Sequence, residues 1–259
     1  MSLLQDNPHL FILLCSIIGL MVGSFLNVVI HRLPIMMEHT WHQQCAELQG
    51  AEANVSPTYN IATPRSMCPN CGHKITVLEN IPVLSYLFLK GRCSQCHQKV
   101  SLRYPIVEIL SSILSGYIAW HFGFSLLTFA ALIFVWAMIV LAAIDFDTQL
   151  LPDDITLPLL WLGLLINLNN GFTHIQSAII GAVIGYLILW SIYWIFKLVT
   201  GKEGMGYGDF KLLAAIGAWF GWIMLPLVIL LSSLAGAMIG LVLMFSSGHK
   251  RDIPIPFGP

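Results

Sequence analysis

The chain has 259 residues, of which 57% are hydrophobic and only 10% charged, and its mean hydropathy is +0.79. Soluble domains carry about 25% charged residues, so this composition excludes an ordinary water-soluble globule. The many aromatic and aliphatic side chains exclude a disordered chain, and a formal net charge of −1 gives no bulk attraction for nucleic acid or anionic lipid. The sequence therefore predicts an integral membrane protein.

The first apolar run covers residues 8–30, which is enough for a helix of about 20 residues to cross a bilayer. It lacks the basic start of a signal peptide and is longer than the apolar part of one, so residues 1–30 are expected to hold a retained first transmembrane helix. Residues 31–104 contain most of the basic residues and form the one hydrophilic domain. A multi-span domain is expected over residues 105–259.

Apolar runs in that last domain cover residues 105–122, 125–144, 155–170, 176–198 and 212–245. The last run would be roughly 51 Å long as one helix, which exceeds a single span, so it is predicted to break near Phe220–Trp222 or Pro226. Seven crossings then place all 12 Lys and Arg on one side. The positive-inside rule makes this side cytoplasmic and the N-terminus external. The predicted fold class is an all-α polytopic membrane protein of about seven spans with a small cytoplasmic domain.

Four cysteines form two C-x-x-C pairs, Cys68 with Cys71 and Cys93 with Cys96, which are separated by 21 residues. This spacing favours a zinc-ribbon-like site in which four thiolates complete a structural Zn²⁺ tetrahedron. Disulfides or free thiols are the alternative, although a reducing cytoplasm disfavours disulfides. Gly72 and Gly91 flank the pairs, where crowding near a metal favours a missing side chain. The basic residues of this domain are scattered, so no nucleic-acid partner is expected.

Two aspartates, Asp145 and Asp209, are predicted at the cytoplasmic boundary of the membrane, one at the end of a span and one near the start of another. Two facing carboxyl groups share a proton and can activate a water molecule, which supports peptide hydrolysis. Asp147 could equally be a loop residue, and Asp153 or Asp154 could cap the helix that follows Pro152.

Asp209 follows four closely spaced glycines, at positions 201, 204, 206 and 208. Missing Cβ atoms would let an extended substrate backbone approach the acid. The alternative is a plain interhelical loop with Asp209 as a helix-start residue. The sequence has neither H-E-x-x-H nor G-x-S-x-G, so the metalloprotease and serine-hydrolase motifs are missing.

Several strings resemble the type IV prepilin peptidases, which are bifunctional inner-membrane enzymes. Beside the two cysteine pairs, these strings are GSFLNVVIHRLP (23–34), RYPIVE (103–108), IDFDTQLLPD (144–153), GKEGMGYGDFK (201–211) and PIPFGP (254–259). The resemblance implies that Asp145 and Asp209 are the catalytic pair. It also implies prepilin and type II secretion pseudopilin substrates, cleavage after a leader glycine at the cytoplasmic face, and N-methylation of the new terminus from S-adenosylmethionine.

The resemblance further implies an eighth span beyond residue 259, so that the 105–259 domain is truncated at its C-terminus. The resemblance also implies that the cysteine-bearing region 31–104 is associated with methyl transfer. No S-adenosylmethionine signature is visible in residues 31–104, and the sequence assigns no residue to this activity. Two other functions stay open, namely a non-enzymatic zinc-ribbon scaffold of pilus assembly and a proton-coupled transporter.

Overall fold

The computed structural model describes residues 2–50, 59–202 and 204–247, and these residues form helices and loops with only two isolated β-bridges. Two parts of the sequence-based predictions lie outside the described residues. These are the basic residues Lys250 and Arg251, used to predict the topology, and the string 254–259, used for the family resemblance. The chain divides into two compact units, residues 1–140 and 141–259. The all-helical prediction is confirmed for the described part of the chain.

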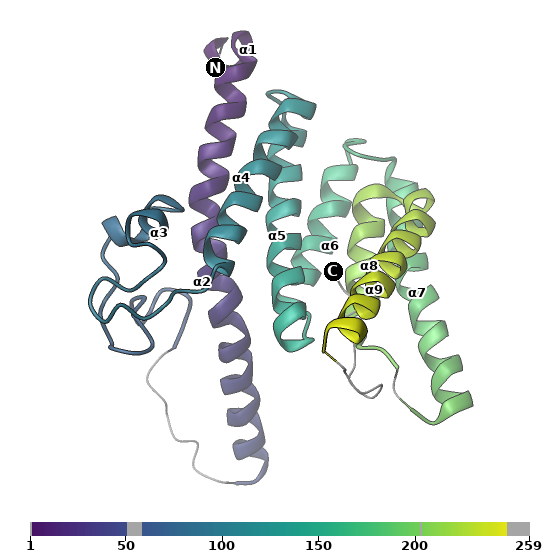
Figure 1. Cartoon of the computed structure of the whole chain (residues 1–259). Coiled ribbons are helices and arrows are strands. Elements are labelled where there is room, and N and C mark those ends of the chain that lie inside the picture. Colours follow the sequence, from purple (N-terminus) through teal and green to yellow (C-terminus); the bar gives the residue numbers. More distant parts are fainter. Residues whose placement is uncertain (1, 51–58, 203, 248–259) are drawn as a thin grey trace. The chain divides into compact units, whose positions relative to one another are not determined.

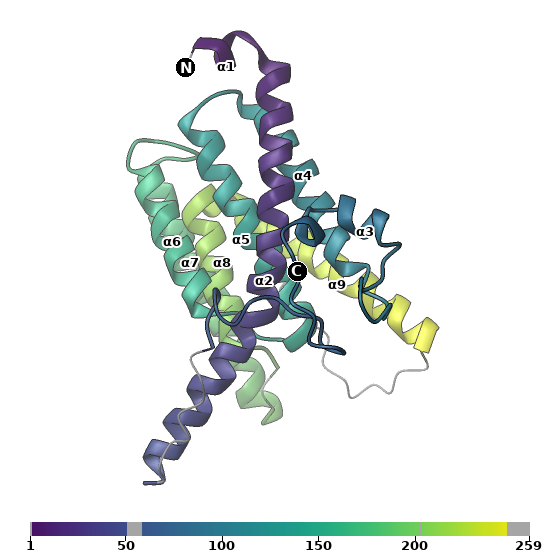
Figure 2. The ribbon, with the colours of Figure 1, turned by 90° about the vertical axis from the view of Figure 1, so that its left-hand side faces the viewer.

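The N-terminal unit is built on a long helix, α2 (Pro8–Leu48), which lies beside α4 (Arg103–Phe122) in both ribbon views (Figures 1 and 2). Small residues allow this close approach, because a Cβ on Gly23 would lie only 2.7 Å from the Cα of Glu108. The hydroxyl of Ser112 also donates to the carbonyl of Ser16 at 2.9 Å. Close packing of small residues is typical of helices within membranes.

Helix α2 does not end where the first predicted apolar run ends. It continues as one helix from residue 30 to Leu48, and its last turns are polar and exposed. Its apolar part exposes large side chains such as Leu13, Ile17 and Met21, which is the expected surface of a helix that faces lipid. The apolar run therefore marks only part of the helix.

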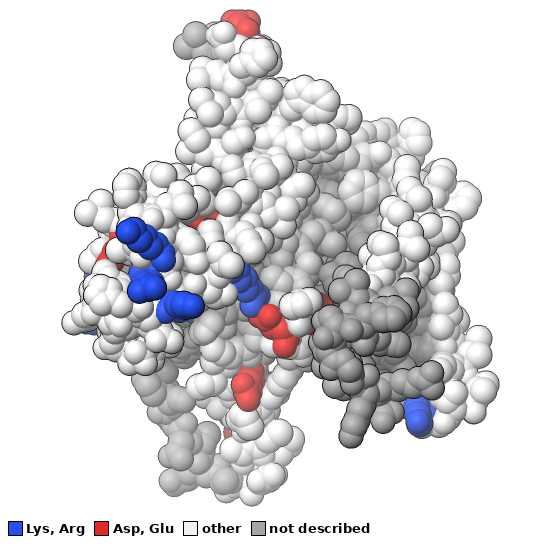
Figure 3. Space-filling model, in the orientation of Figure 1, with Lys and Arg blue, Asp and Glu red and all other residues white. Residues whose placement is uncertain are grey.

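The rest of the N-terminal unit is a cysteine-containing lobe, residues 59–101, and the first part of α5 (Leu126–Thr148). The lobe holds the short helices η1 (Leu78–Asn80) and α3 (Leu84–Phe88), and α1 (Ser2–Asp6) precedes α2. Figure 3 shows several Lys and Arg side chains on the lobe, whereas the turns of α2 above the lobe are uncharged on this face.

The C-terminal unit contains the end of α5 and the helices α6 (Asp153–Asn167), α7 (Ile175–Thr200), α8 (Tyr207–Phe220) and α9 (Leu225–Ser247), with η2 (Trp222–Met224) before α9. Helices α7 and α8 touch through a glycine pair, because a Cβ on Gly217 would lie within 2.2 Å of the Gly181 carbonyl oxygen. Glycine at both positions lets the two backbones meet.

Buried polar contacts join α6 to the end of α8. The side chain of Asn167, which is fully buried, donates to the carbonyls of Ala218 and Trp219 at 2.8 and 3.0 Å and accepts from the N–H groups of Phe172 and Thr173. The Trp219 indole donates to the Leu159 carbonyl at 2.8 Å. A buried network with its partners satisfied fixes one arrangement of the helices.

The predicted break in the last apolar run is confirmed at Gly221, where α8 ends. Its φ of +80° lies in the region that favours glycine. The acidic stretch 145–154 forms a shorter loop than its composition suggests, because α5 runs on to Thr148 and α6 already begins at Asp153. Within the described residues, α2, α5 and α7 are long and apolar enough to cross a membrane.

Candidate active site and metal centre

Asp145 lies in the last turn of α5 and is the one buried acid of its cluster, with 4% of its surface exposed. The neighbouring Ile144 is fully buried, whereas Asp147, Asp153 and Asp154 are exposed. An ionised group at a buried position carries a desolvation penalty that exposed acids avoid, so burial is typical of functional acids. The sequence left the choice within this cluster open, and burial singles out Asp145.

Asp209 lies in the first turn of α8, outside the three candidate spans, and is half-buried. Burial and then the negative charge of Asp145 raise the pKa of Asp209 to about 6, although a hydrogen bond with the Gly206 backbone opposes the shift. The two carboxyl groups therefore lie within electrostatic range of each other in the C-terminal unit. Such a pair holds one proton between its members up to about pH 6.

The glycines before Asp209 serve different purposes. Gly201 ends α7 with a φ of +70°, and a Cβ on Gly204 would come within 2.7 Å of the Phe196 ring. A Cβ on Gly208 would lie 2.6 Å from the Cβ of Leu151, so Gly208 lets the loop 149–152 pack against α8. A Cβ on Gly206 would make only ordinary contact, 3.8 Å from Asp209 Oδ2, so this glycine lies beside the acid without being required by crowding. Of these glycines, Gly206 is therefore the one at which a missing Cβ could let a substrate backbone approach Asp209.

Asp153 does not cap α6, contrary to one reading of the sequence. The N-cap position is Pro152, without a side-chain cap, and Asp153 and Asp154 follow in the first turn, where acids favour the helix dipole. The Asp153 carboxylate instead accepts two hydrogen bonds from Lys211 Nζ, at 2.7 and 2.6 Å. The sequence did not indicate a role for Lys211, whose only signal was its place two residues after Asp209.

The four cysteines of the lobe converge, as their spacing predicts. Their Sγ atoms all lie within 4.8 Å of one another, with 3.8 Å between Cys68 and Cys96 and 3.9 Å between Cys71 and Cys93. Ligands about 2.3 Å from a tetrahedral Zn²⁺ ion stand about 3.8 Å apart. The donor set and its spacing therefore fit a metal ion held by four thiolates.

Each cysteine pair lies in the same type of turn. In the first, the Cys68 N–H donates to the His73 carbonyl and the Gly72 N–H donates to the Cys68 carbonyl, both at 2.9 Å. In the second, the Cys93 N–H donates to the Gln98 carbonyl at 2.9 Å and the His97 N–H to the Cys93 carbonyl at 3.1 Å. Short antiparallel bridges, Met67 with Lys74 and Arg92 with Lys99, close both turns.

Gly72 and His97 take equivalent positions in these turns, with φ values of +70° and +56°. A Cβ on Gly72 would meet no atom within 4 Å, so the glycine there satisfies a left-handed backbone and not a crowded one. The crowding expected at Gly91 is present, but it comes from the Tyr86 hydroxyl at 2.6 Å. The sequence did not indicate that His97 is the counterpart of Gly72.

The four thiols lie close enough to shift one another's pKa values. The backbone N–H of Gln98 and then the side chain of Asn70 lower the pKa of Cys96 to about 6. A hydrogen bond with the His73 backbone favours the Cys71 thiolate, but burial and the three neighbouring thiols raise the pKa of Cys71 to about 12. A divalent cation would remove this conflict by neutralising the thiolates.

These features define a helical membrane protein with a lobe whose four clustered cysteines could hold a metal ion and with a coupled pair of carboxyl groups. Two family models match the chain, the bacterial peptidase A24 N-terminal domain over residues 17–122 and the type IV leader peptidase family over residues 132–241. The chain belongs to the type IV leader peptidase family.

Relatives named prepilin leader peptidase/N-methyltransferase match nearly the whole chain. The protein of Stutzerimonas stutzeri is 54% identical over 99% of this chain and 89% of its own length, and that of Pseudomonas aeruginosa is 53% identical over the same shares. The protein of Aeromonas hydrophila is 53% identical over 100% of this chain and 90% of its own length. No solved structure matches the chain.

Proposed function

We propose that this protein is a membrane-bound aspartic endopeptidase that removes the leader from type IV prepilins and N-methylates the new terminal residue. The pairing of a buried Asp145 with a raised-pKa Asp209 is the observation that carries the peptidase part. The names of relatives that are 54% and 53% identical to this chain, prepilin leader peptidase/N-methyltransferase, support both activities. Type II secretion pseudopilins are proposed as further substrates, because many members of this enzyme family process them as well as prepilins.

The carboxyl pair performs hydrolysis without a covalent intermediate. The ionised carboxyl takes a proton from a water molecule while the water oxygen bonds to the carbonyl carbon of the scissile peptide. The protonated carboxyl donates its proton to the carbonyl oxygen. The tetrahedral intermediate then collapses and its C–N bond breaks. The departing amine receives a proton from one carboxyl, and a hydroxyl of the intermediate returns its proton to the other carboxylate as the new carbonyl forms. One water is consumed and the pair returns to its single shared proton.

The proposed setting is the inner membrane, with about seven crossings, an external N-terminus and both sites facing the cytoplasm. The apolar exposed faces of α2, α5 and α7 support the membrane setting. The placement of Lys and Arg in the sequence supports the orientation. A carboxyl pair at the inner boundary suits a substrate whose leader is cytoplasmic and whose next segment is an apolar helix, with cleavage after the leader glycine.

The four-cysteine lobe is proposed to hold one structural Zn²⁺ ion. The chemistry of the four thiolates and their Sγ spacing support zinc. Four protein ligands leave no open position for a substrate, so the ion stabilises the fold of residues 59–101 and takes no part in hydrolysis. The methyl group comes from S-adenosylmethionine, and the new terminal amine bonds to that methyl carbon as its C–S bond breaks, with loss of one proton from the amine.

The test is in vitro processing of a prepilin, followed by mass analysis of the new terminus. Asp145→Asn and Asp209→Asn should each lower leader cleavage by about a thousandfold or more, since each removes one member of the pair. Both should still methylate a pre-cleaved peptide. Asp154→Asn, an exposed acid of the same cluster, is the matched control and should cleave normally.

Normal cleavage in either variant of the pair would contradict the peptidase mechanism. Two other results would point to the alternative functions. Function that is lost on chelation but does not need either aspartate indicates a zinc-ribbon scaffold. Proton-dependent flux in liposomes that requires both acids indicates a transporter.

A further inference from the structure

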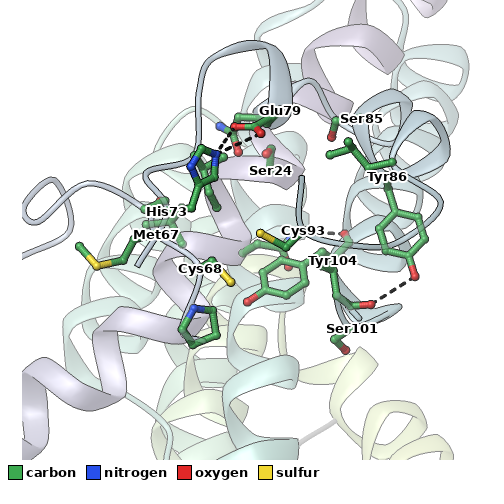
Figure 4. Close-up of a pocket in the computed structure, with 18 of the residues that line it drawn as sticks. Ser24, Met67, Cys68, His73, Glu79, Ser85, Tyr86, Cys93, Ser101 and Tyr104 are labelled. Carbon is green, nitrogen blue, oxygen red and sulfur yellow. Dashed lines mark hydrogen bonds and ion pairs between the residues drawn. The ribbon is translucent and has the colours of Figure 1, made fainter. Parts of the chain in front are cut away.

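A cavity of about 670 Å³ opens within the N-terminal unit, between α2, the start of α4 and the cysteine lobe. This volume is typical of sites for drug-sized or cofactor-sized molecules. Figure 4 shows Ser24, Cys68, Cys93, Tyr86 and Tyr104 around this space, with the His73–Glu79 pair at another side of it. The carboxyl pair Asp145 and Asp209 belongs to the other unit and does not line it.

Three sequence strings that the hydrolytic mechanism leaves unused meet at this cavity. Ser24, Asn27, His31 and Arg32 come from the string 23–34, while Tyr104, Pro105 and Glu108 come from the string 103–108. Cys68 and Cys93 come from the two cysteine pairs, one from each. The Asn27 side chain donates to the Tyr104 carbonyl at 3.1 Å and so connects the first two strings directly. Their convergence indicates a shared role.

The cavity contains one buried cation and one buried anion, Arg32 with 7% and Glu108 with 8% of their surfaces exposed. The Arg32 guanidinium donates only to the carbonyl oxygens of residues 60, 61 and 64 and lies 5.7 Å from the Tyr59 ring centre. The Glu108 carboxylate accepts from the Val83 N–H at 2.7 Å and from Ser24. Neither charge forms an ion pair within the described residues.

Unpaired buried charges are costly, and a ligand of opposite charge relieves this cost. A separate buried cation and buried anion therefore favour a ligand that carries both a carboxylate and a positive group. Glu79, the other acid that lines the cavity, is less able to pair with a positive group of a ligand. Its carboxylate already lies 3.2 Å from His73 Nε2 and accepts hydrogen bonds from Thr76. The tyrosine rings that line the same space can contact a flat ring of the ligand.

The backbone at the edge of the cavity is strained. Val83 has a φ of +60°, which a β-branched residue rarely adopts, and its N–H is the group that Glu108 binds. Strain of this kind is concentrated at ligand sites, where the surrounding contacts hold it. Glu108 therefore also connects α4 to the lobe at the point where the lobe borders the cavity.

We propose that this cavity binds S-adenosylmethionine, with Arg32 opposite its carboxylate and Glu108 opposite its positively charged end. The molecule combines a carboxylate, an ammonium and a sulfonium group with an adenosine, which matches the two unpaired charges and the ring surfaces. This assignment rests on the proposed N-methyltransferase activity and specifies the residues that serve it. Arg32 and Glu108 thereby gain a role that the sequence by itself did not indicate.

The test is direct binding of S-adenosylmethionine to the purified full chain, with radiolabelled ligand and equilibrium dialysis. Arg32→Gln and Glu108→Gln should each raise Kd by about tenfold or more, because each removes a charge-assisted contact. Arg32→Lys should recover part of the affinity. Lys74→Gln and Glu47→Gln, which remove an exposed charge of the same sign outside the cavity lining, should leave Kd unchanged. Bound metal and helical circular dichroism show whether each variant is folded.

A ligand without the carboxylate separates a specific contact from a general effect. Decarboxylated S-adenosylmethionine should bind the wild type as weakly as Arg32→Gln binds the natural ligand, and Arg32→Gln should not weaken it further. An equal loss for both ligands would overturn the role of Arg32. In the wild type, an azido-adenosine photolabel should attach to peptides within residues 24–108, and labelling confined to other peptides would overturn the site without any variant.

The outcomes also separate this site from the proposed function. If the wild type methylates a pre-cleaved peptide while all four Gln variants bind the ligand alike, the cavity assignment is wrong and the methyltransferase activity stands. If the wild type neither binds S-adenosylmethionine nor methylates the peptide, the methyltransferase part of the proposed function fails as well.

Discussion

Lys211 Nζ donates to both carboxylate oxygens of Asp153, at 2.7 and 2.6 Å, and so joins the second turn of α8 to the first turn of α6. Asp209 lies two residues before Lys211 on α8, and the chain between Asp145 and Asp153 forms the end of α5 and the short loop that follows. The ion pair therefore holds the two segments that carry the carboxyl pair. We infer that it positions the two acids without contacting the substrate.

Removing this ion pair should affect catalysis more than stability. Lys211→Ala should lower kcat for leader cleavage by about tenfold to a hundredfold, because small displacements of catalytic groups are costly. The free energy of unfolding should change by about 1 kcal/mol or less, as is usual for a partly exposed pair. Steady-state cleavage and thermal unfolding measure the two effects, and Lys202→Ala is the control.

The reversed pair, Asp153→Lys with Lys211→Asp, should recover much of the lost rate. A purely structural role predicts instead that stability and rate fall together in the single variants. Either single variant with normal kcat would show that the pair is dispensable.

Leader cleavage should depend on pH through Asp209. Its pKa is raised from 3.8 to about 6, so the group keeps its proton to a higher pH than a free aspartate. Because the mechanism needs one proton on the pair, kcat should fall as the pH rises past about 6. The pH profile of kcat with a saturating prepilin peptide measures this, and a flat profile between pH 5 and about 8 would contradict it.

The same shift predicts an effect on stability. A raised carboxyl pKa means that the folded state binds the proton more tightly than the unfolded state does. Its stabilising contribution is therefore complete below about pH 4 and is lost as the pH rises to about 6. Asp209→Asn removes this loss, so the variant should become more stable than the wild type as the pH rises through this interval. Thermal unfolding of both proteins across the interval measures the difference.

Gly206 and Gly208 should respond differently to one added methyl group. Gly206 has a φ of −79° and its Cβ position meets no atom closer than 3.8 Å, so Gly206→Ala should fold normally and raise KM by hindering substrate approach. Gly208→Ala would push against Leu151 and should lower stability by about 1–3 kcal/mol. Kinetics and thermal unfolding of the two variants distinguish these results, and equal stability losses would refute the distinction.

The purified protein should contain one zinc ion per chain by elemental analysis. Cys68→Ser with Cys93→Ser should lose the metal and make residues 59–101 sensitive to protease, because the binding free energy of a structural metal is also folding free energy. Cys45→Ser alters an exposed cysteine outside the cluster and should keep the metal. Unchanged metal content in the double variant would reject the four-thiolate site.

Much of the site could be predicted because its signals are local. Apolar runs indicate helices, the two C-x-x-C pairs indicate a metal site, and the strings around Asp145 and Asp209 indicate the carboxyl pair. The choice of Asp145 within its cluster rested on family resemblance alone until burial supported it. The N-cap role considered for Asp153 was wrong, because its actual partner, Lys211, is far away in the sequence.

Hydropathy, residue spacing and motif order thus established a helical membrane protein with four candidate metal ligands and a candidate acid pair, since these properties depend on neighbours along the chain. The burial of Asp145, the Lys211–Asp153 ion pair, the left-handed turn at His97 and the cavity containing Arg32 and Glu108 emerged only in three dimensions. Each of these features depends on contacts between segments up to about eighty residues apart, or on a backbone conformation that such contacts select. Local sequence composition does not determine such contacts or conformations.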